Sequence, residues 1–218
     1  MLFAAFETST DWCSVALWRD GDLRAVERRA PNRHSELALP MLQTLLEQGK
    51  TSLAALDAVA FGAGPGSFTG LRIACGLAQG IALARGCPVL GVSTLEGMAE
   101  ESGAGRVVAC LDARMREVYY AAYERQDSGW QETLAPRCVA PADASMPPGE
   151  GWVGCGNGFA AYGNLGLATV RPEIHPSAAA VARLAAPRLA AGQGVDPSQA
   201  APVYVREKVA LTMAEQAR

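Results

Sequence analysis

The sequence contains very little lysine and histidine. Of its 218 residues, only Lys50 and Lys208 are lysine, and only His34 and His175 are histidine. A P-loop needs a lysine beside its phosphate-binding glycines, and a histidine-based zinc site needs several imidazoles. The scarcity of both residue types therefore argues against lysine chemistry and against a histidine-rich metal centre.

An excess of positive charge is also missing. The 19 Lys and Arg residues are outnumbered by 22 Asp and Glu residues, which gives a formal net charge of −3. Residues 1–105 carry 8 basic and 11 acidic groups, and residues 106–218 carry 11 of each. A protein that grips nucleic-acid backbones without help needs a basic surface. The composition excludes that class of protein for the isolated chain.

The sequence has neither paired cysteines nor a long apolar run. Its six cysteines are too widely spaced for a CxxC motif, which excludes a zinc knuckle or a dithiol pair. The N-terminus lacks a basic segment, and the longest apolar stretch, residues 73–84, is too short to span a bilayer. We therefore expect a soluble, cytoplasmic protein whose thiols are reduced.

Half of the residues are hydrophobic, and their spacing predicts strands and helices packed in layers. The helix at 35–48 would be capped by Ser35, with Pro40 in its early turns. The expected strands of the first half lie near residues 2–8, 13–18, 23–28, 58–62 and 89–92, and the expected helices near 35–48, 69–85 and 94–101. This order predicts an α/β fold with a mixed sheet.

The pattern restarts near residue 106, where strands at 106–112 and 117–123 repeat the opening hairpin at an offset of 105 residues. Aligned without gaps, Val15 falls on Tyr120. The repeat indicates either a duplicated unit or the general likeness of any two hairpins in a mixed sheet. We divide the chain into an N-terminal lobe, 1–105, and a smaller C-terminal lobe, 106–218. The second lobe replaces a helix with a Pro-rich stretch and ends in an Ala-rich helix at 177–191, an extended segment at 202–206 and a polar tail.

The densest glycine cluster, at residues 62–70, lies between an expected strand and an expected helix. Backbone N–H groups at such a helix start can bind anions, and Ser67 or Thr69 could cap the helix. The spacing matches neither the P-loop, nor GxGxxG, nor the GxSxG nucleophile turn. We favour a tight loop over an anion site. The candidate anion or nucleotide contacts are Gly64, Gly66, Ser67 and Thr69.

Glu7 and Asp112 each end the first strand of a half. Acids paired across a cleft hold magnesium in ATP-dependent enzymes of duplicated build. Neither acid here is followed by a glycine that would let a phosphate approach, so we interpret both as remnants. His34, beside Ser35, suggests a metal site or a hydrolase, but it lacks partners at a fitting spacing. We favour packing of His34 at a helix start, and we predict no metal site.

The two central helices are more apolar than one sheet contact requires. On residues 35–48 the apolar arc spans about 200°. On the long helix, Ile73, Leu77, Ile81 and Ala84 are expected to meet the sheet, while the opposite face is nearly uncharged and carries small residues. An uncharged outer face implies a partner, or else burial under another part of the chain. The predicted partner-binding residues are Leu39, Leu42, Leu46, Arg72, Cys75, Gly76, Gln79 and Leu83. Gly76→Arg or Leu42→Asp is expected to abolish partner binding without unfolding the chain.

In these same segments the sequence resembles the TsaB family, also called YeaZ. The matching stretches lie in order at residues 6–10, 34–40, 64–72, 112–119 and 202–206. Of these, residues 64–72 (GPGSFTGLR) are the most specific. One departure is Glu7, where the family usually has Asp.

The resemblance implies a duplicated ASKHA fold (actin-like ATPase, related to ribonuclease H), with two lobes and a degenerate nucleotide site. It implies a non-catalytic subunit that pairs with the catalytic protein TsaD through the two central helices. That assembly makes N6-threonylcarbamoyladenosine at the tRNA adenosine next to the anticodon. The ATPase TsaE joins it, and isolated members form homodimers. Metal and ATP or ADP would be bound by the partners or at the shared interface, and tRNA would be reached indirectly.

The alternative is an enzyme in its own right. It would be an ATP-dependent phosphotransferase of ASKHA type or a glycoprotease-like metallopeptidase, working through Glu7, Asp112 and His34.

Overall fold

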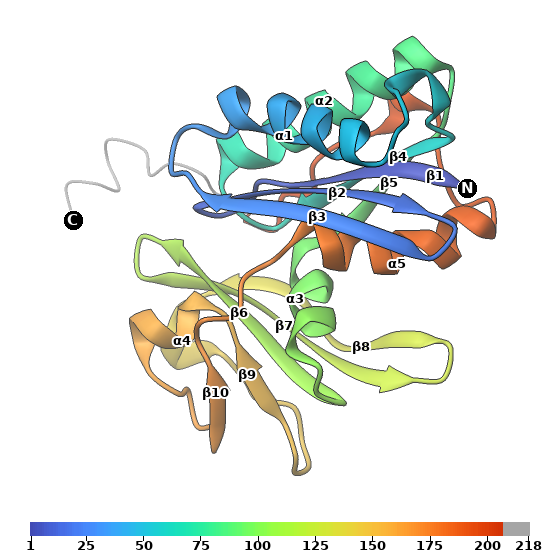
Figure 1. Ribbon diagram of the computed structural model, residues 1–218. Coiled ribbons are helices and arrows are strands. Elements are labelled where there is room, and N and C mark those ends of the chain that lie inside the picture. Colours follow the sequence, from blue (N-terminus) through green and yellow to red (C-terminus); the bar gives the residue numbers. More distant parts are fainter. Residues whose placement is uncertain (207–218) are drawn as a thin grey trace.

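The computed structural model describes residues 1–206, which form two five-stranded sheets with helices on their faces (Figure 1). The first sheet has the order β3-β2-β1-β4-β5 and the second the order β10-β9-β6-β7-β8. The expected polar tail lies outside the described residues. Among residues 1–206, no helix is both long enough and apolar enough to cross a membrane.

The strands of the first sheet are β1 (Leu2–Glu7), β2 (Trp12–Arg19), β3 (Asp22–Arg29), β4 (Ala58–Gly64) and β5 (Val89–Ser93). Those of the second are β6 (Arg106–Arg114), β7 (Glu117–Gln126), β8 (Gly129–Val139), β9 (Val153–Cys155) and β10 (Thr169–Arg171). The helices are α1 (His34–Gln48), α2 (Phe68–Arg85), α3 (Thr94–Ser102), α4 (Asn157–Tyr162) and α5 (Ala178–Ala190), with short 3₁₀ turns η1 (Leu53–Ala55), η2 (Pro141–Asp143) and η3 (Pro197–Gln199).

The two sheets have the same pattern of strand pairing. β1 pairs antiparallel with β2 and parallel with β4, and β6 pairs in the same way with β7 and β9. The expected α/β fold with an internal duplication is therefore confirmed. The second copy has no counterpart of α1, because the Pro-rich stretch after β8 forms only η2.

The gap-free alignment of the two hairpins is wrong by one residue in the second strand. Phe6 pairs with Val15, whereas the equivalent Leu111 pairs with Tyr119 rather than Tyr120. A register shift between Asp112 and Arg114 accounts for the difference.

The helices form layers around the sheets. In Figure 1, α1 and α2 cover the outer face of the first sheet, α5 covers its other face, and α3 lies between the two sheets. Buried Phe6, Leu42 and Phe61 belong to the core under α1 and α2. β4 is buried along its whole length, as expected for a central strand covered on both faces.

The last helix of each copy packs on the sheet of the other copy. On α5, Val181 packs with Phe3 of the first sheet, and on α3, Met98 packs with Val107 of the second. The expected boundary at residue 105 thus falls between the sheets but not between their helices. Sequence order could not show this, because an amphipathic helix does not indicate which sheet it will cover.

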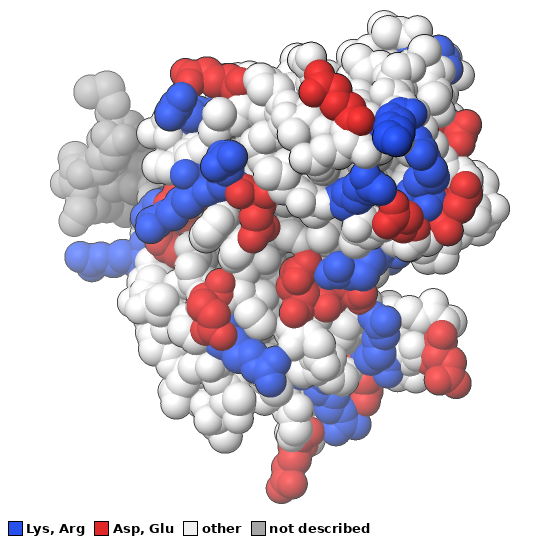
Figure 2. All heavy atoms as spheres, in the orientation of Figure 1, with Lys and Arg blue, Asp and Glu red and all other residues white. Residues whose placement is uncertain are grey.

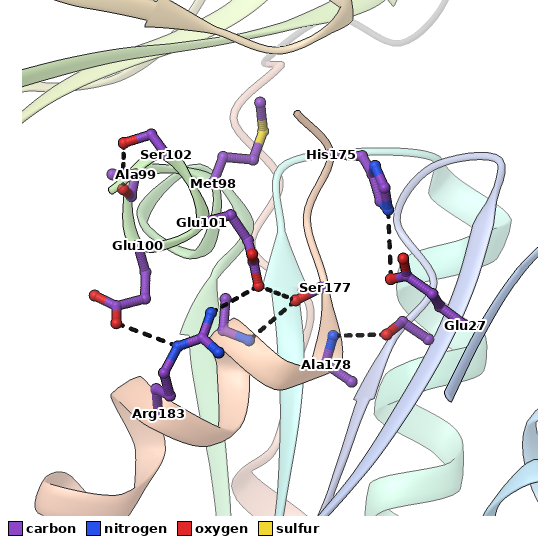
Figure 3. Close-up of polar contacts among 12 residues, drawn as sticks. Glu27, Met98, Ala99, Glu100, Glu101, Ser102, His175, Ser177, Ala178 and Arg183 are labelled. Carbon is purple, nitrogen blue, oxygen red and sulfur yellow. Dashed lines mark hydrogen bonds and ion pairs between the residues drawn. The ribbon is translucent and has the colours of Figure 1, made fainter. Parts of the chain in front are cut away.

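Ion pairs and hydrogen bonds join α3 to α5 at this crossing (Figure 3). Arg183 Nη2 lies 2.7 Å from Glu101 Oε1, and Arg183 Nε lies 3.3 Å from Glu100 Oε1. The Ser177 hydroxyl also donates to Glu101. Burial disfavours a charged Glu100, but hydrogen bonds from Trp130 and Arg125 outweigh it and lower the pKa of this carboxyl. The two lobes are therefore tied together through charged groups that are largely paired.

The two central helices differ in their N-terminal capping. α2 starts at the Ser67 cap, whose hydroxyl accepts a hydrogen bond from Gly70 N at 3.4 Å, and it ends at Gly86 with φ 65°. α1 starts at His34, and Arg33 at the cap position makes no side-chain capping bond. The Ser35 cap was therefore predicted wrongly.

Candidate functional site

The loop between β4 and α2 packs directly on the loop that follows β1. A Cβ added at Gly66 would lie 2.6 Å from Ser9 Cβ, and one added at Gly70 would collide with the carbonyl oxygen of Thr8. Ser67 N donates to Ser9 O at 2.7 Å, and Thr8 Oγ1 donates to Gly70 O at 2.7 Å. Glycine is needed at these positions because backbone approaches backbone.

Gly64 has a similar reason to be glycine. Its φ is +117°, and a Cβ there would lie 2.6 Å from Val203 O. The neighbouring Ala63 accepts a hydrogen bond from Val203 N at 2.7 Å. Gly64 and Gly66 therefore contact protein, in agreement with the tight-loop interpretation. Ser67 and Thr69 are exposed on the adjacent cleft, where anion binding stays a prediction.

Glu7 is buried beneath this loop rather than exposed in a cleft. Ser9 N donates to its Oε1 at 2.7 Å, and Thr94 Oγ1 donates to its Oε2 at 3.4 Å. Burial raises the pKa of the Glu7 carboxyl, with hydrogen bonds from Ser9 and Thr94 opposing the rise. A carboxyl held in this way is a core group.

A cleft of about 860 Å³ separates the two lobes. Asp112 and Asn157 line it from the second lobe, and His34 and Ser67 line it from the first. Asp112 Oδ1 accepts hydrogen bonds from Arg114 N at 2.8 Å and from Tyr162 OH at 3.2 Å. Glu7 is not among the residues that line the cleft, so the two strand-end acids do not face each other across it.

The two histidines are held by their neighbours. His34 is buried at the start of α1, and burial lowers the pKa of its imidazole. His175 stacks on Trp12 with ring centroids 4.2 Å apart, and its Nε2 lies 3.4 Å from Glu27 Oε2. Within the described 206 residues, no group of three or more His, Cys, Asp or Glu side chains is arranged to hold a metal ion.

The partner-binding prediction is partly wrong, because three of its residues belong to the core. Leu42, Leu46 and Cys75 are buried against the first sheet. Ile73, Leu77 and Ile81 are only partly buried and Ala84 is exposed, so the side of α2 that was expected to meet the sheet is not the side that does. Residues on several sides of α2 are apolar, and a periodic pattern cannot then indicate which side meets the sheet.

α1 and α2 nevertheless turn some apolar residues to solvent, on α1 among exposed polar residues such as Glu36, Gln43 and Glu47. Leu39 on α1 is 46% exposed and Leu83 on α2 is 76% exposed. Between these positions in sequence, Gly76 and Gly80 are exposed glycines with no atom within 4 Å of a Cβ built on either one. We call the exposed residues Leu39, Gly76, Gly80 and Leu83 the outer helix face.

The remaining predicted residues of α2 contact the C-terminal segment. Gln79 Nε2 donates to Pro197 O at 3.1 Å and to Ala200 O at 3.0 Å. Arg72 Nε donates to Tyr204 OH at 3.0 Å. We call residues 197–206 the strap, because it runs from these contacts on α2 to the second lobe.

The strap is fixed in the second lobe by Arg206. Its Nη2 donates to Ala113 O at 2.8 Å and lies 2.6 Å from Glu117 Oε2. The sequence predicts an extended segment at 202–206, but no local pattern indicates that it bridges the lobes. The predicted interface also omitted Gly80, although the four-residue spacing from Gly76 puts both glycines on one side of the helix.

Known proteins match this chain in sequence and in fold. The family model described as "TsaD: tRNA N6-adenosine threonylcarbamoyltransferase" matches residues 26–197. The TsaB protein of Escherichia coli K12, a tRNA threonylcarbamoyladenosine biosynthesis protein, is 42% identical over 225 residues, with 96% of both chains covered.

Two solved structures from Pseudomonas aeruginosa have the same fold. One, described as similar to the peptidase YEAZ, has a TM-score of 0.90 at 37% identity, covering 94% of this chain and 99% of that one. The other, YeaZ, has a TM-score of 0.88 at 38% identity, covering 93% and 99%. The resemblance found in the sequence is confirmed, and the chain belongs to the TsaB (YeaZ) family.

Proposed function

We propose that this chain is a non-catalytic subunit of the machinery that makes N6-threonylcarbamoyladenosine in tRNA, and that its outer helix face binds a TsaD-like catalytic subunit. The pathway is supported by the relative from E. coli, which is named as a biosynthesis protein of this modification. A TsaE-like ATPase, the metal and ATP or ADP belong in this proposal to the partner subunits or to the shared interface.

The observation that carries the binding role is the pair of exposed glycines on α2. A glycine inside a helix costs about 0.5–1 kcal/mol relative to alanine. Glycines at crowded positions have an intramolecular reason, but Gly76 and Gly80 have none, because space is open above both. Small residues let a second helix approach closely. Leu83 follows Gly76 by seven residues, so it lies on the same side of α2 and adds exposed apolar area there, and Leu39 adds exposed apolar area on α1.

The non-catalytic role is supported by where the candidate catalytic groups lie. Glu7 is enclosed by Ser9 and Thr94, and the glycines that would have to admit a phosphate contact the protein's own backbone. The strap bridges the lobes at one place and the α3–α5 ion pairs join them at another. This arrangement suits a rigid platform for a partner.

The test is co-purification and calorimetry with the TsaD-like subunit. Gly76→Arg and Leu83→Asp are expected to abolish the heterodimer and the modification of tRNA in vitro, with unchanged circular dichroism. The matched control is Leu53→Asp, since Leu53 is 41% exposed on η1, which packs near α2 but is not part of the outer helix face. If both α2 variants still assemble with the catalytic subunit, the assigned interface is wrong.

The same face would also support a homodimer of the isolated chain, since the exposed glycines fit a second copy of α2 as well. Gly76→Arg should then convert any dimer to a monomer in sedimentation experiments.

The competing function is an enzyme acting alone. It predicts tight, stoichiometric binding of Mg-ATP or zinc to the isolated chain, together with turnover. We expect neither in calorimetry, and turnover without a partner would overturn the scaffold proposal.

A further inference from the structure

The turn between β6 and β7 has an unusual backbone. Arg114, Met115 and Arg116 have φ values of 61°, 54° and 61°. Arg114 pairs with Glu117, so Met115 and Arg116 form a two-residue hairpin loop in which both residues have positive φ. Such loops strongly favour Asn-Gly or Gly-Gly, because side chains are strained in the left-handed region. Here the loop carries two long side chains instead.

The turn presents two guanidinium groups to solvent. The Arg114 side chain is 80% exposed, and its acidic partner Asp112 lies 3.3 Å away. Arg116 is exposed and forms no ion pair within residues 1–206. Met115 is 61% exposed and lies 3.8 Å from Arg206 Nη1, which connects the turn to the strap. Exposed pairs contribute little to stability, so both arginines are available to an anion.

An arginine–aromatic group lies on the first-lobe side of the interlobe cleft. The Arg72 guanidinium lies 3.6 Å from the centroid of the Phe68 ring, and the Tyr204 ring lies 5.6 Å from Phe68. Both aromatic side chains are about half exposed. Phe68, Tyr204, Arg114 and Met115 all line the interlobe cleft. We call these residues, with Arg72 and Arg116, the cleft rim.

We propose that the cleft rim contacts the RNA substrate directly. In this arrangement Arg114 and Arg116 bind phosphates, and the exposed ring of Tyr204 or Phe68 stacks on an unpaired base. Proteins bind single-stranded RNA through this combination of arginines and aromatic platforms. The inference rests on the proposed function and deepens it, because Arg72 lies one helical turn from Gly76 of the outer helix face. RNA at the rim would therefore pass beside the bound catalytic subunit.

The charge of the whole chain shows that the rim cannot be a complete RNA-binding surface. Figure 2 shows acidic and basic side chains interspersed over one face, with no continuous basic area. The rim would add a few contacts to those of the partner. Each phosphate contact contributes about 0.7–0.9 to the slope of log K against log salt. Removing two contacts is thus measurable as a change in slope.

The experiment is a fluorescence-anisotropy titration of the heterodimer with a labelled anticodon stem-loop over a series of salt concentrations. Arg114→Ala with Arg116→Ala is expected to reduce the salt slope by about 1.5 and to weaken binding at low salt. Tyr204→Ala is expected to weaken binding about tenfold, while Tyr204→Phe keeps the stacking surface. The control is Arg19→Ala, an exposed arginine at the far end of β2. Competition with ATP and with inorganic phosphate tests whether the rim binds free phosphate compounds instead.

Heterodimer formation is measured on the same samples by size-exclusion chromatography. Unchanged affinity and slope in the rim variants would overturn the proposal, as would equal losses in Arg19→Ala. If the rim variants lose the catalytic subunit instead, the rim is a protein interface. Displacement by ATP or phosphate at equal strength would make it a small-anion site. If even the unmodified chain forms no heterodimer, the proposed function fails. The same titration is then made on the chain alone at low salt, and it tests RNA binding by the rim independently of the partner.

Discussion

The Glu7 carboxylate occupies the space that a side chain at residue 62 would need. A Cβ built on Gly62 would collide with Glu7 Oε2. Glu7 ends β1 and Gly62 lies on the neighbouring strand β4, so an acid is packed against a glycine in the middle of the first sheet. In this protein the strand-end acid is part of the core, and its position depends on glycine beside it.

This contact predicts opposite effects for two Gly→Ala substitutions. Gly62→Ala forces Glu7 to move and is expected to destabilise the chain by about 1–3 kcal/mol. Gly76→Ala meets open space and is expected to stabilise it by about 0.5–1 kcal/mol. Urea unfolding of both variants measures the two values. A stable Gly62→Ala variant would mean that the carboxylate is not fixed as described.

Gly76→Ala should also weaken partner binding, although it stabilises the isolated chain. The added methyl group lies where a partner helix would approach. Calorimetry with the catalytic subunit should show lower affinity for Gly76→Ala, and more so for Gly80→Leu. Unchanged affinity in both variants would show that no helix of the partner approaches α2 closely at these two glycines.

The raised pKa of Glu7 predicts a pH-dependent stability difference. In the unfolded chain this carboxyl titrates near its ordinary value of 4.5, and in the folded protein it titrates higher because it is buried. Its contribution is therefore fully present below pH 4.5 and is lost as pH rises through the folded value. Glu7→Gln has no such loss, so its stability relative to the parent should increase between pH 4.5 and neutrality.

Urea unfolding at a series of pH values measures this difference, with the exposed Glu150→Gln as control. A difference that stays constant with pH, or that decreases as pH rises, would contradict the assignment of Glu7 as a buried group with a raised pKa.

Leu42 and Leu39 should differ sharply, although both lie on α1. Leu42 is 1% exposed and Leu39 is 46% exposed. Leu42→Ala is expected to cost about 2–5 kcal/mol of unfolding free energy because it leaves a cavity. Leu39→Ala is expected to change stability by less than about 0.5 kcal/mol. Leu42→Asp is consequently a folding mutant, and the earlier expectation that it would leave the chain folded is wrong.

Gln79 should control the anchoring of the strap. Gln79→Ala removes the hydrogen bonds to Pro197 O and Ala200 O, each worth about 1 kcal/mol. Hydrogen exchange at Val203 N, which donates to Ala63 O, should accelerate in this variant. Gln43→Ala, on the exposed side of α1, is the control. Unchanged exchange would show that the strap is held from its other end by Arg206.

The strands and helices of the first lobe were largely predictable because their signals are local, whereas β8, β9, α4 and β10 of the second lobe were not predicted. The buried run of β4, the Ser67 cap and the terminal Gly86 of α2 were all visible in the printed sequence. The orientation of α2 was not, because Cys75 and Leu77 lie on nearly opposite sides of the helix and both are apolar. Only the position of α2 over β4 determines which side of this helix is exposed.

The residues of the candidate site were likewise predictable only where the signal is local. Gly76 and Leu83 were found from their spacing, and both are exposed. The contacts of Gln79 and Arg72 with the strap join residues more than a hundred positions apart, and no local pattern contains such information. The strained turn at Met115 was hidden too, because a Met-Arg pair does not predict positive φ.

The exchange of α3 and α5 between the two sheets has an evolutionary consequence. A newly duplicated gene encodes two units, and each can be lost or altered while the other still folds. Once each unit covers its core with the other's last helix, a break near residue 105 would leave two fragments with uncovered cores. The exchange therefore makes both copies necessary: the second copy can lack a counterpart of α1 and have a short α4, but neither copy can be deleted without uncovering the core of the other.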